Sequence, residues 1–129
     1  MTRHVDLLGT LFILWGAVLL LVSLALITLG LGVAAVFVGS GAEETGATLT
    51  AGAAIGVFGA LAVLSILCGA VHLWVAFALR RLSDWARAVG VIVAIVDLFV
   101  PPIGTALGAY AVWVLTNRDV RALFDVPAG

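Results

Sequence analysis

The fold is decided by residues 80–124, RRLSDWARAVGVIVAIVDLFVPPIGTALGAYAVWVLTNRDVRALF. Two short apolar runs meet here at Pro101 and Pro102, and arginines flank both runs at their other ends. Proline lacks a backbone N–H and pushes the residue before it out of the helical region, so two prolines followed by Gly104 end one helix and begin another. The stretch therefore predicts a short membrane hairpin that turns at Pro101-Pro102 and keeps its arginines on one side of the bilayer.

The composition of the whole chain is that of a membrane protein. Its 129 residues are 64% hydrophobic and 10% charged, with a mean hydropathy of +1.32. The connectors between apolar runs are too short to form a soluble domain, which needs roughly 40 residues or more. We predict one all-α integral membrane domain, residues 1–129, with four transmembrane helices at about 7–33, 50–79, 84–100 and 103–118 and an interfacial segment at 118–126.

Arginine is the only strongly basic residue type in the chain, and its distribution predicts the orientation. The chain has six arginines and no lysine. Because basic residues remain on the cytoplasmic side, we expect both termini and the Arg80–Arg87 connector inside, with Glu43-Glu44 and Pro101-Pro102 outside. The expected contacts with lipid headgroups are made by Arg80, Arg81, Arg87, Arg118 and Arg121. These arginines are too few to indicate a nucleic-acid partner.

The first apolar run, Leu7–Gly39, has 33 residues without a charge. As one helix it would measure about 50 Å, and it is far longer than the apolar region of a signal peptide, so we expect a retained span. Small residues recur in it at intervals of seven, at Gly9, Gly16, Ser23 and Gly30. This spacing predicts a packing seam for another helix.

The second apolar run, Ala47–Leu79, also has 33 uncharged residues and carries a stripe of small residues at spacings of three and four. The stripe consists of Gly52, Gly56, Gly59, Ala62, Ser65, Gly69, His72 and Ala76. It predicts a face that packs against protein rather than lipid. On the third predicted helix, Ala86, Gly90, Ala94 and Asp97 lie at spacings of four, four and three, and on the fourth Gly104 and Gly108 lie four apart, so both helices have faces suited to close packing.

His72 lies on this stripe, about 12 Å along a helix from Arg80, and a polar ring at that depth needs a partner. It is the one weak candidate for a cofactor-binding residue, through haem ligation, metal binding or a proton relay. The alternative is an interhelical hydrogen bond to Ser65, Thr10 or a backbone carbonyl. Because His4 lies at the membrane edge and Cys68 is alone, we expect no cofactor and no metal.

Asp97 is the one charged residue inside an apolar run, which makes it a candidate functional site. It lies one turn before Pro101, so its carboxylate can also fold over the turn and accept hydrogen bonds from amides near Gly104 or from the Thr105 hydroxyl. We favour this capping interpretation over a proton or cation site. Glu43 and Glu44 lie on a glycine-rich loop, where solvated carboxylates are the simpler interpretation.

The carboxyl-terminal third, DWARAVGVIVAIVDLF…PIGTALGAYAVWVLTNRDVRALF, resembles the last hairpin of small, uncharacterised four-span bacterial membrane proteins. The matching positions are Trp85, Ala86, Arg87, Pro102 to Gly108, Tyr110, Trp113 to Leu115, Arg121 and Phe124. The chain departs from that pattern at Val100-Pro101 and Ala109. The resemblance implies four spans and a bacterial cytoplasmic membrane, and it brings no established activity.

Our leading functional hypothesis is a non-enzymatic membrane protein that acts through helix packing, as a homo-oligomer or as a small accessory subunit of a membrane complex. One alternative is an oligomeric channel or transporter that uses Asp97 and His72. Another is a lipid- or cofactor-binding membrane protein. An enzyme is not expected, because no nucleophile and base occur together in a recognisable pattern and no ligand cluster is evident.

Overall fold

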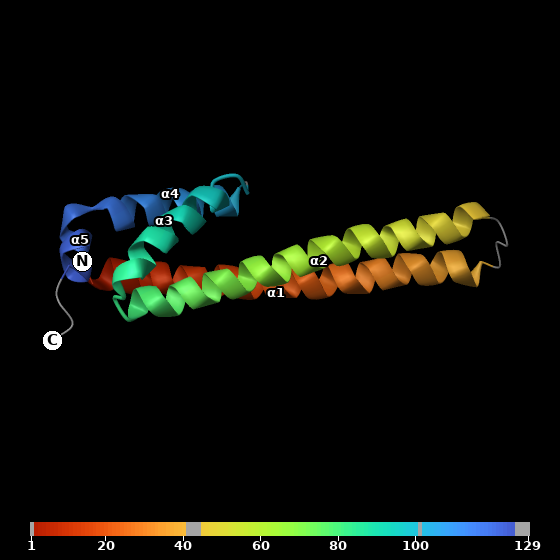
Figure 1. The fold of residues 1–129 in the computed structure, drawn as a ribbon, viewed down its shortest axis with the longest axis horizontal. Coiled ribbons are helices and arrows are strands. Elements are labelled where there is room, and N and C mark those ends of the chain that lie inside the picture. The colour runs from red at the N-terminus through yellow and green to blue at the C-terminus, as the bar shows by residue number, and fades with distance from the viewer. Residues whose placement is uncertain (1, 41–44, 101, 126–129) are drawn as a thin grey trace. The chain divides into compact units, whose positions relative to one another are not determined.

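The structure is a computed structural model that describes residues 2–40, 45–100 and 102–125. In these residues it contains five α-helices and no strand, so the prediction of an all-helical protein is confirmed (Figure 1). The helices are α1 (Thr2–Gly39), α2 (Thr45–Arg80), α3 (Asp84–Asp97), α4 (Ile103–Thr116) and α5 (Arg118–Phe124). Glu43, Glu44 and Pro101 lie outside the described residues.

Two helices of the described chain are long and apolar enough to cross a membrane. They are α1, with 38 residues, and α2, whose membrane-compatible part Gly46–Arg80 has 35 residues. Both extend beyond the predicted spans, because apolar composition limits the part of a helix that fits the bilayer and does not determine where the helix ends. By contrast, α3 and α4 have 14 residues each. Each is about 21 Å long against a hydrocarbon core of roughly 30 Å, so four full-length spans are not confirmed.

The chain divides into two compact units. Unit 1 consists of residues 1–15 and 71–129, and unit 2 consists of residues 16–70. Unit 1 therefore holds the first part of α1, the last part of α2, and all of α3, α4 and α5. Unit 2 holds the remaining parts of α1 and α2.

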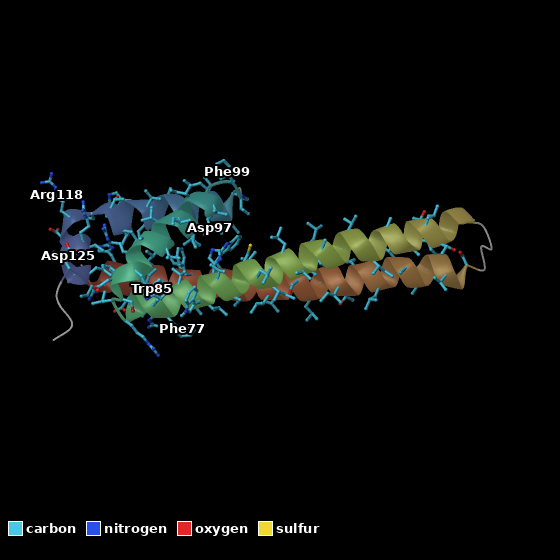
Figure 2. All side chains as sticks on the ribbon, in the orientation of Figure 1. Phe77, Trp85, Asp97, Phe99, Arg118 and Asp125 are labelled. Carbon is cyan, nitrogen blue, oxygen red and sulfur yellow. The ribbon has the colours of Figure 1, made fainter. Side chains whose placement is uncertain are left out.

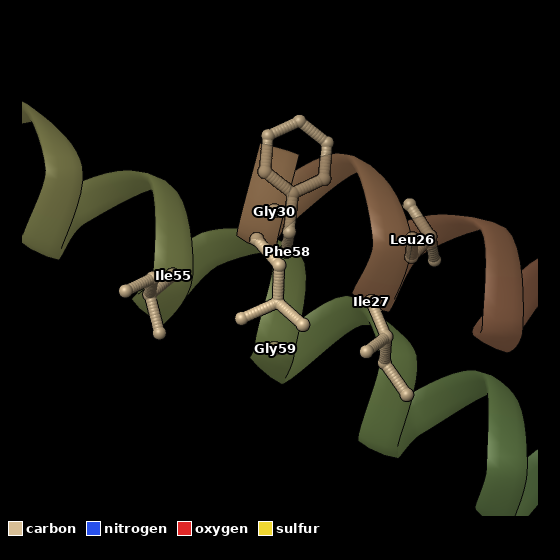
Figure 3. Close-up of a pocket in the computed structure, with 7 residues that line it drawn as sticks. Leu26, Ile27, Gly30, Ile55, Phe58 and Gly59 are labelled. Atoms are coloured by element: carbon tan, nitrogen blue, oxygen red, sulfur yellow. The ribbon is translucent and has the colours of Figure 1, made fainter. Parts of the chain in front are cut away.

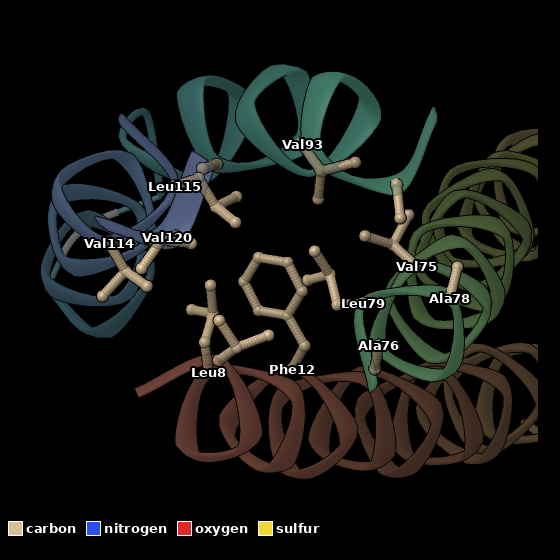
Figure 4. Packing of buried hydrophobic residues seen from close by; sticks show 14 of the residues in the cluster. Leu8, Phe12, Val75, Ala76, Ala78, Leu79, Val93, Val114, Leu115 and Val120 are labelled. Atoms are coloured by element: carbon tan, nitrogen blue, oxygen red, sulfur yellow. The ribbon is translucent and has the colours of Figure 1, made fainter. Parts of the chain in front are cut away.

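Every helix in unit 1 contributes side chains to one apolar core. Figure 4 shows Phe12 of α1 directed toward Leu79 of α2, with Leu115 of α4 and Val120 of α5 on the opposite wall. These four side chains are fully buried. The buried face of α3 follows helical spacing and consists of Ala86, Gly90, Val93, Ala94 and Asp97. Small side chains on that face let α3 approach the core closely.

The turn between α2 and α3 has a left-handed residue, Leu82, with φ of 51°. The backbone N–H groups of Leu82 and Ser83 donate to the carbonyls of Leu79 and Ala78, which closes the end of α2. Ser83 occupies the N-cap position of α3, but its side chain makes no capping hydrogen bond there. Asp84 lies in the first turn, where its charge suits the helix dipole.

Glycines bring α3 and α4 into close contact. A Cβ added to Gly108 would overlap the carbonyl oxygen of Ala94, and one added to Gly104 would lie 2.7 Å from the carbonyl oxygen of Asp97. The hydroxyl of Thr105 donates to the Leu98 carbonyl at 2.9 Å. The chain thus turns between Asp97 and Ile103, and Pro102 occupies the N-cap position of α4.

Unit 2 is a pair of helices packed on small residues. Gly16, Ser23 and Gly30 of α1 are all buried. A Cβ on Gly30 would lie 2.8 Å from Cβ of Phe58, and one on Gly69 would lie 3.0 Å from the Gly16 carbonyl oxygen. Figure 3 shows Gly30 beside Phe58, at an apolar pocket that Ile27, Ile55 and Gly59 also line.

The glycines in the first part of α2 do not contact the rest of the described chain. A Cβ added to Gly52, Gly56 or Gly59 would meet no atom of the described chain within 4 Å. Their predicted packing against protein is therefore not made within the described chain, and packing against another protein stays a prediction. The physical reason is that a helix paired with one neighbour buries one face only, and the glycines at 52, 56 and 59 lie away from the contact that Gly69 makes.

Candidate functional site

The candidate site is a buried pair formed by His72 of α2 and Asp97 of α3. Nε2 of His72 lies 2.8 Å from Oδ2 and 3.1 Å from Oδ1 of Asp97, so the ring N–H donates to the carboxylate. The two side chains are only 5% and 4% exposed. Figure 2 shows Asp97 close to the turn that joins α3 and α4.

Helix geometry places both residues in the interior of unit 1. Asp97 continues the buried face that Gly90 and Ala94 form on α3. His72 is followed on α2 by the buried residues Val75, Ala76 and Leu79, at the spacings of one helix face. The left-handed turn at Leu82 then brings these two faces together.

An aromatic ring forms one wall of the site. The rings of Phe12 in α1 and His72 are 5.5 Å apart between centroids and meet edge to face at 72°. Phe12 is fully buried, which removes water from that side of the imidazole. In such surroundings a hydrogen bond between charged groups is much stronger than in water, and an isolated charge is costly.

The capping interpretation of Asp97 is wrong. Its carboxylate contacts His72, and α4 has no side-chain capping bond at its N-cap position. The Thr105 hydroxyl, the expected partner, donates instead to the Leu98 carbonyl. The carboxylate turns inward because Asp97 belongs to the buried face of α3.

Asp97 is also the partner of His72 that sequence reasoning did not identify. Of the expected partners, Thr10 donates its hydroxyl to the carbonyl of Asp6 at 2.9 Å. The sequence indicated that His72 and Asp97 each lie on a small-residue stripe, and the transport hypothesis put them in one pathway. It did not indicate a direct bond between them.

The pair has two chemical capabilities. A single proton added to a neutral imidazole and an ionised carboxylate makes the pair neutral overall, which suits a buried site. The pair can therefore hold a proton, and it can fasten α3 to α2. Within the described ranges, no three His, Cys, Asp or Glu side chains gather as a metal site would require.

The other predicted polar residues of unit 1 lie at its surface. Arg80, Arg81, Arg118 and Arg121 are exposed and Arg87 is half-buried. Trp74 and Trp85 lie beside each other with ring centroids 4.9 Å apart, and both are exposed. Exposed indole rings near arginines are typical of a membrane interface.

A second polar contact joins the beginning of α1 to α4. Nδ1 of His4 lies 3.2 Å from the hydroxyl of Tyr110, and the His4 ring meets Trp113 edge to face at 6.0 Å. Sequence reasoning missed this contact, although Tyr110 and Trp113 lie three residues apart on one face of a helix.

Comparison with protein-family models, with curated proteins and with solved structures finds no match for this chain.

Proposed function

We propose that the chain is a non-enzymatic integral membrane protein that acts through helix packing, either with copies of itself or as a small accessory subunit of a membrane complex. Its place is the bacterial cytoplasmic membrane, where α1 and α2 cross the bilayer, α3 and α4 are embedded beside them, and both termini are cytoplasmic. The arginines then contact lipid headgroups on the cytoplasmic side.

The observation that carries this proposal is the open glycine face of α2 in unit 2. Gly52, Gly56 and Gly59 have room for another helix, since no atom of the described chain lies within 4 Å of a Cβ there. Around them the exposed side chains are apolar, including Leu49, Ile55 and Val63. Helices in membranes associate through such small residues, because close approach of the backbones gains van der Waals contact.

The test is Gly56→Leu. We expect the leucine side chain to block close approach of a second helix, so that the oligomer or co-purified subunit recovered after mild solubilisation falls at least tenfold. The thermal stability of the isolated chain should stay unchanged, because the position is open within the chain. Native mass measurement determines how much of the oligomer or co-purified subunit is lost and identifies the partner.

Gly32→Leu provides the matched control. Gly32 is equally open but lies on α1, two residues after Gly30, which contacts Phe58, and so on the other side of that helix. It should retain the assembly. Unchanged assembly in Gly56→Leu, or equal loss in both variants, would contradict the proposed face.

A second function is favoured by one specific observation, the buried His72–Asp97 pair. Ionisable residues inside membrane helices commonly belong to ion or proton pathways. On this alternative, the protein is an oligomeric channel or transporter whose pathway includes the pair.

Reconstituted vesicles distinguish the two functions. If the pair carries a flux of protons or cations, Asp97→Asn should lower that flux at least tenfold, because the amide cannot exchange a proton at neutral pH. Asp119→Asn on α5, an exposed position, is the control. Absence of flux in the wild-type protein would contradict the transport function and would not affect the proposal of a packing function.

A further inference from the structure

We infer that the α3–α4 hairpin is re-entrant: its turn end inserts into the acyl chains of the cytoplasmic leaflet and the chain returns to the cytoplasmic side without crossing. This inference rests on the proposed membrane location. It assigns a lipid partner to the apolar surface of unit 1 and replaces two of the four crossings that the sequence predicts.

The first argument is length. Each helix of the hairpin has 14 residues, which gives about 21 Å, whereas a crossing helix needs about 20 residues to traverse roughly 30 Å. Arg87, the arginine of the hairpin nearest to the turn, lies 14 residues before Pro101. The length of helix between this arginine and the turn is therefore also too short to cross the bilayer. A hairpin of this length ends inside the bilayer.

The second argument is the distribution of polarity along the hairpin. The turn end is apolar and exposed, with Phe99 at 82% and Ile103 at 61%. The opposite end carries Arg87, the exposed Trp85 and, just beyond α4, Arg118. Figure 2 shows Phe99 at the turn, and Trp85 and Arg118 toward the far ends of α3 and α4. This order matches a passage from headgroups to hydrocarbon.

The third argument is the hydrogen bonding of the turn itself. Irregular backbone is stable in hydrocarbon only where its polar groups are satisfied internally. Here the N–H groups of Leu98, Phe99 and Val100 donate to the carbonyls of Ala94, Val96 and Asp97. On the other side of the turn, Thr105 N–H donates to the Val100 carbonyl at 3.1 Å, and its hydroxyl donates to the Leu98 carbonyl.

The fourth argument concerns charge. Asp97, the charged residue nearest the turn, is 3% exposed and is paired with His72. If the turn faced water, the carboxylate of Asp97 could be solvated there and would not have to be buried. In lipid an unpaired carboxylate is costly, and the contact with His72 removes that cost.

Single cysteines introduced in a Cys68→Ser background test the inference. Phe99→Cys probes the turn, Gly46→Cys the beginning of α2 and Ala122→Cys the cytoplasmic side at α5. Membrane vesicles of both orientations are treated with a membrane-impermeant maleimide. We expect Gly46→Cys and Ala122→Cys to react from opposite sides, and Phe99→Cys to react at less than a tenth of either rate from both sides.

A fluorophore on Phe99→Cys then reports its surroundings through lipids brominated at different acyl positions. We expect strongest quenching by a mid-chain bromine, and quenching at a shallower depth for Ile92→Cys, which lies about 10 Å nearer the arginines along α3. Both positions are exposed, so the substitutions leave the core intact.

Each contrary result is distinct. Reaction of Phe99→Cys from the Gly46 side would show a full crossing, and reaction from the Ala122 side would show a hairpin in water. Slow reaction without quenching by brominated lipid would show that protein covers the turn. All three overturn the re-entrant hairpin. Reaction of Gly46→Cys and Ala122→Cys from the same side would instead overturn the proposed crossing by α1 and α2.

Discussion

Asp97→Ala is expected to lower the free energy of unfolding by about 3–5 kcal/mol, the usual cost of removing one partner from a buried ion pair. The substitution deletes the acceptor 2.8 Å from Nε2 of His72, where Phe12 and the helix interior keep water away. Asp97→Asn should cost less, about 1–2 kcal/mol, since its amide oxygen still accepts the ring N–H. Unfolding in mixed detergent measures both values.

A double-mutant cycle isolates the pair from other effects of the substitutions. His72→Leu, Asp97→Leu and the double variant should show a coupling energy of about 1–3 kcal/mol, above the roughly 0.6 kcal/mol typical of neutral hydrogen bonds between membrane helices. Asp119→Ala on the surface of α5 is the control, with little expected change. Additive losses at 72 and 97 would show that the contact contributes nothing.

The stability of the double variant also bears on why the pair exists. Buried ion pairs replaced on both sides by apolar residues often leave a protein as stable as before. If that holds here, net stability does not explain His72 and Asp97. The remaining explanations are the register of α3 against α2 and the holding of a proton, which the vesicle experiment separates.

The sequence predicted the helical class and the turn near residues 100–102 because both follow from strong local chemistry. Proline without an N–H disrupts the interior of a helix but is compatible with its first turn, and α3 ends before this turn whereas α4 begins after it. The lengths of the helices were harder to predict from the sequence. Apolar runs of 33 residues predicted spans, whereas α1 also includes Arg3, His4 and Asp6, because a helix can continue beyond the apolar residues that fit the bilayer.

The site was predictable only in part. The spacing of Gly90, Ala94 and Asp97 indicated that Asp97 shares a face with small residues, and His72 had the same signal on its own helix. The contact between them depends on the register of α3 against α2. That register is set by the left-handed backbone at Leu82 and by the core of unit 1, which residue spacing does not specify.

The glycine patterns show the same limit. The glycines at 9, 16 and 30 lie at multiples of seven and those at 52, 56 and 59 at intervals of four and three, and both patterns place small residues on one helix face, yet the first group is buried and the second is open. Periodicity identifies a face that is suited to close packing. It does not identify which face the neighbouring helix occupies.

Gly108→Leu is expected to separate α3 from α4, with a loss of roughly 3 kcal/mol or more in the free energy of unfolding. Even the Cβ of alanine at 108 would overlap the Ala94 carbonyl oxygen and lie 3.0 Å from the Leu98 backbone nitrogen. These are backbone atoms of α3 and of its C-cap residue Leu98, which no side-chain rotation can move aside. Gly108→Ala should therefore cost about 1–2 kcal/mol, although alanine favours a helix over glycine by about 1 kcal/mol.

Gly52→Ala is the matched comparison, because the same substitution at an open position keeps the helix preference and has no clash. Gly52→Ala should leave the free energy of unfolding unchanged or raise it by up to about 1 kcal/mol. Ala109→Leu controls for added volume on an exposed face of α4. If Gly108→Ala and Gly52→Ala change stability alike, the backbones of α3 and α4 do not approach as closely as the structure has them. Loss at 108 alone would establish that this contact holds the hairpin together and keeps Asp97, at the end of α3, within reach of His72.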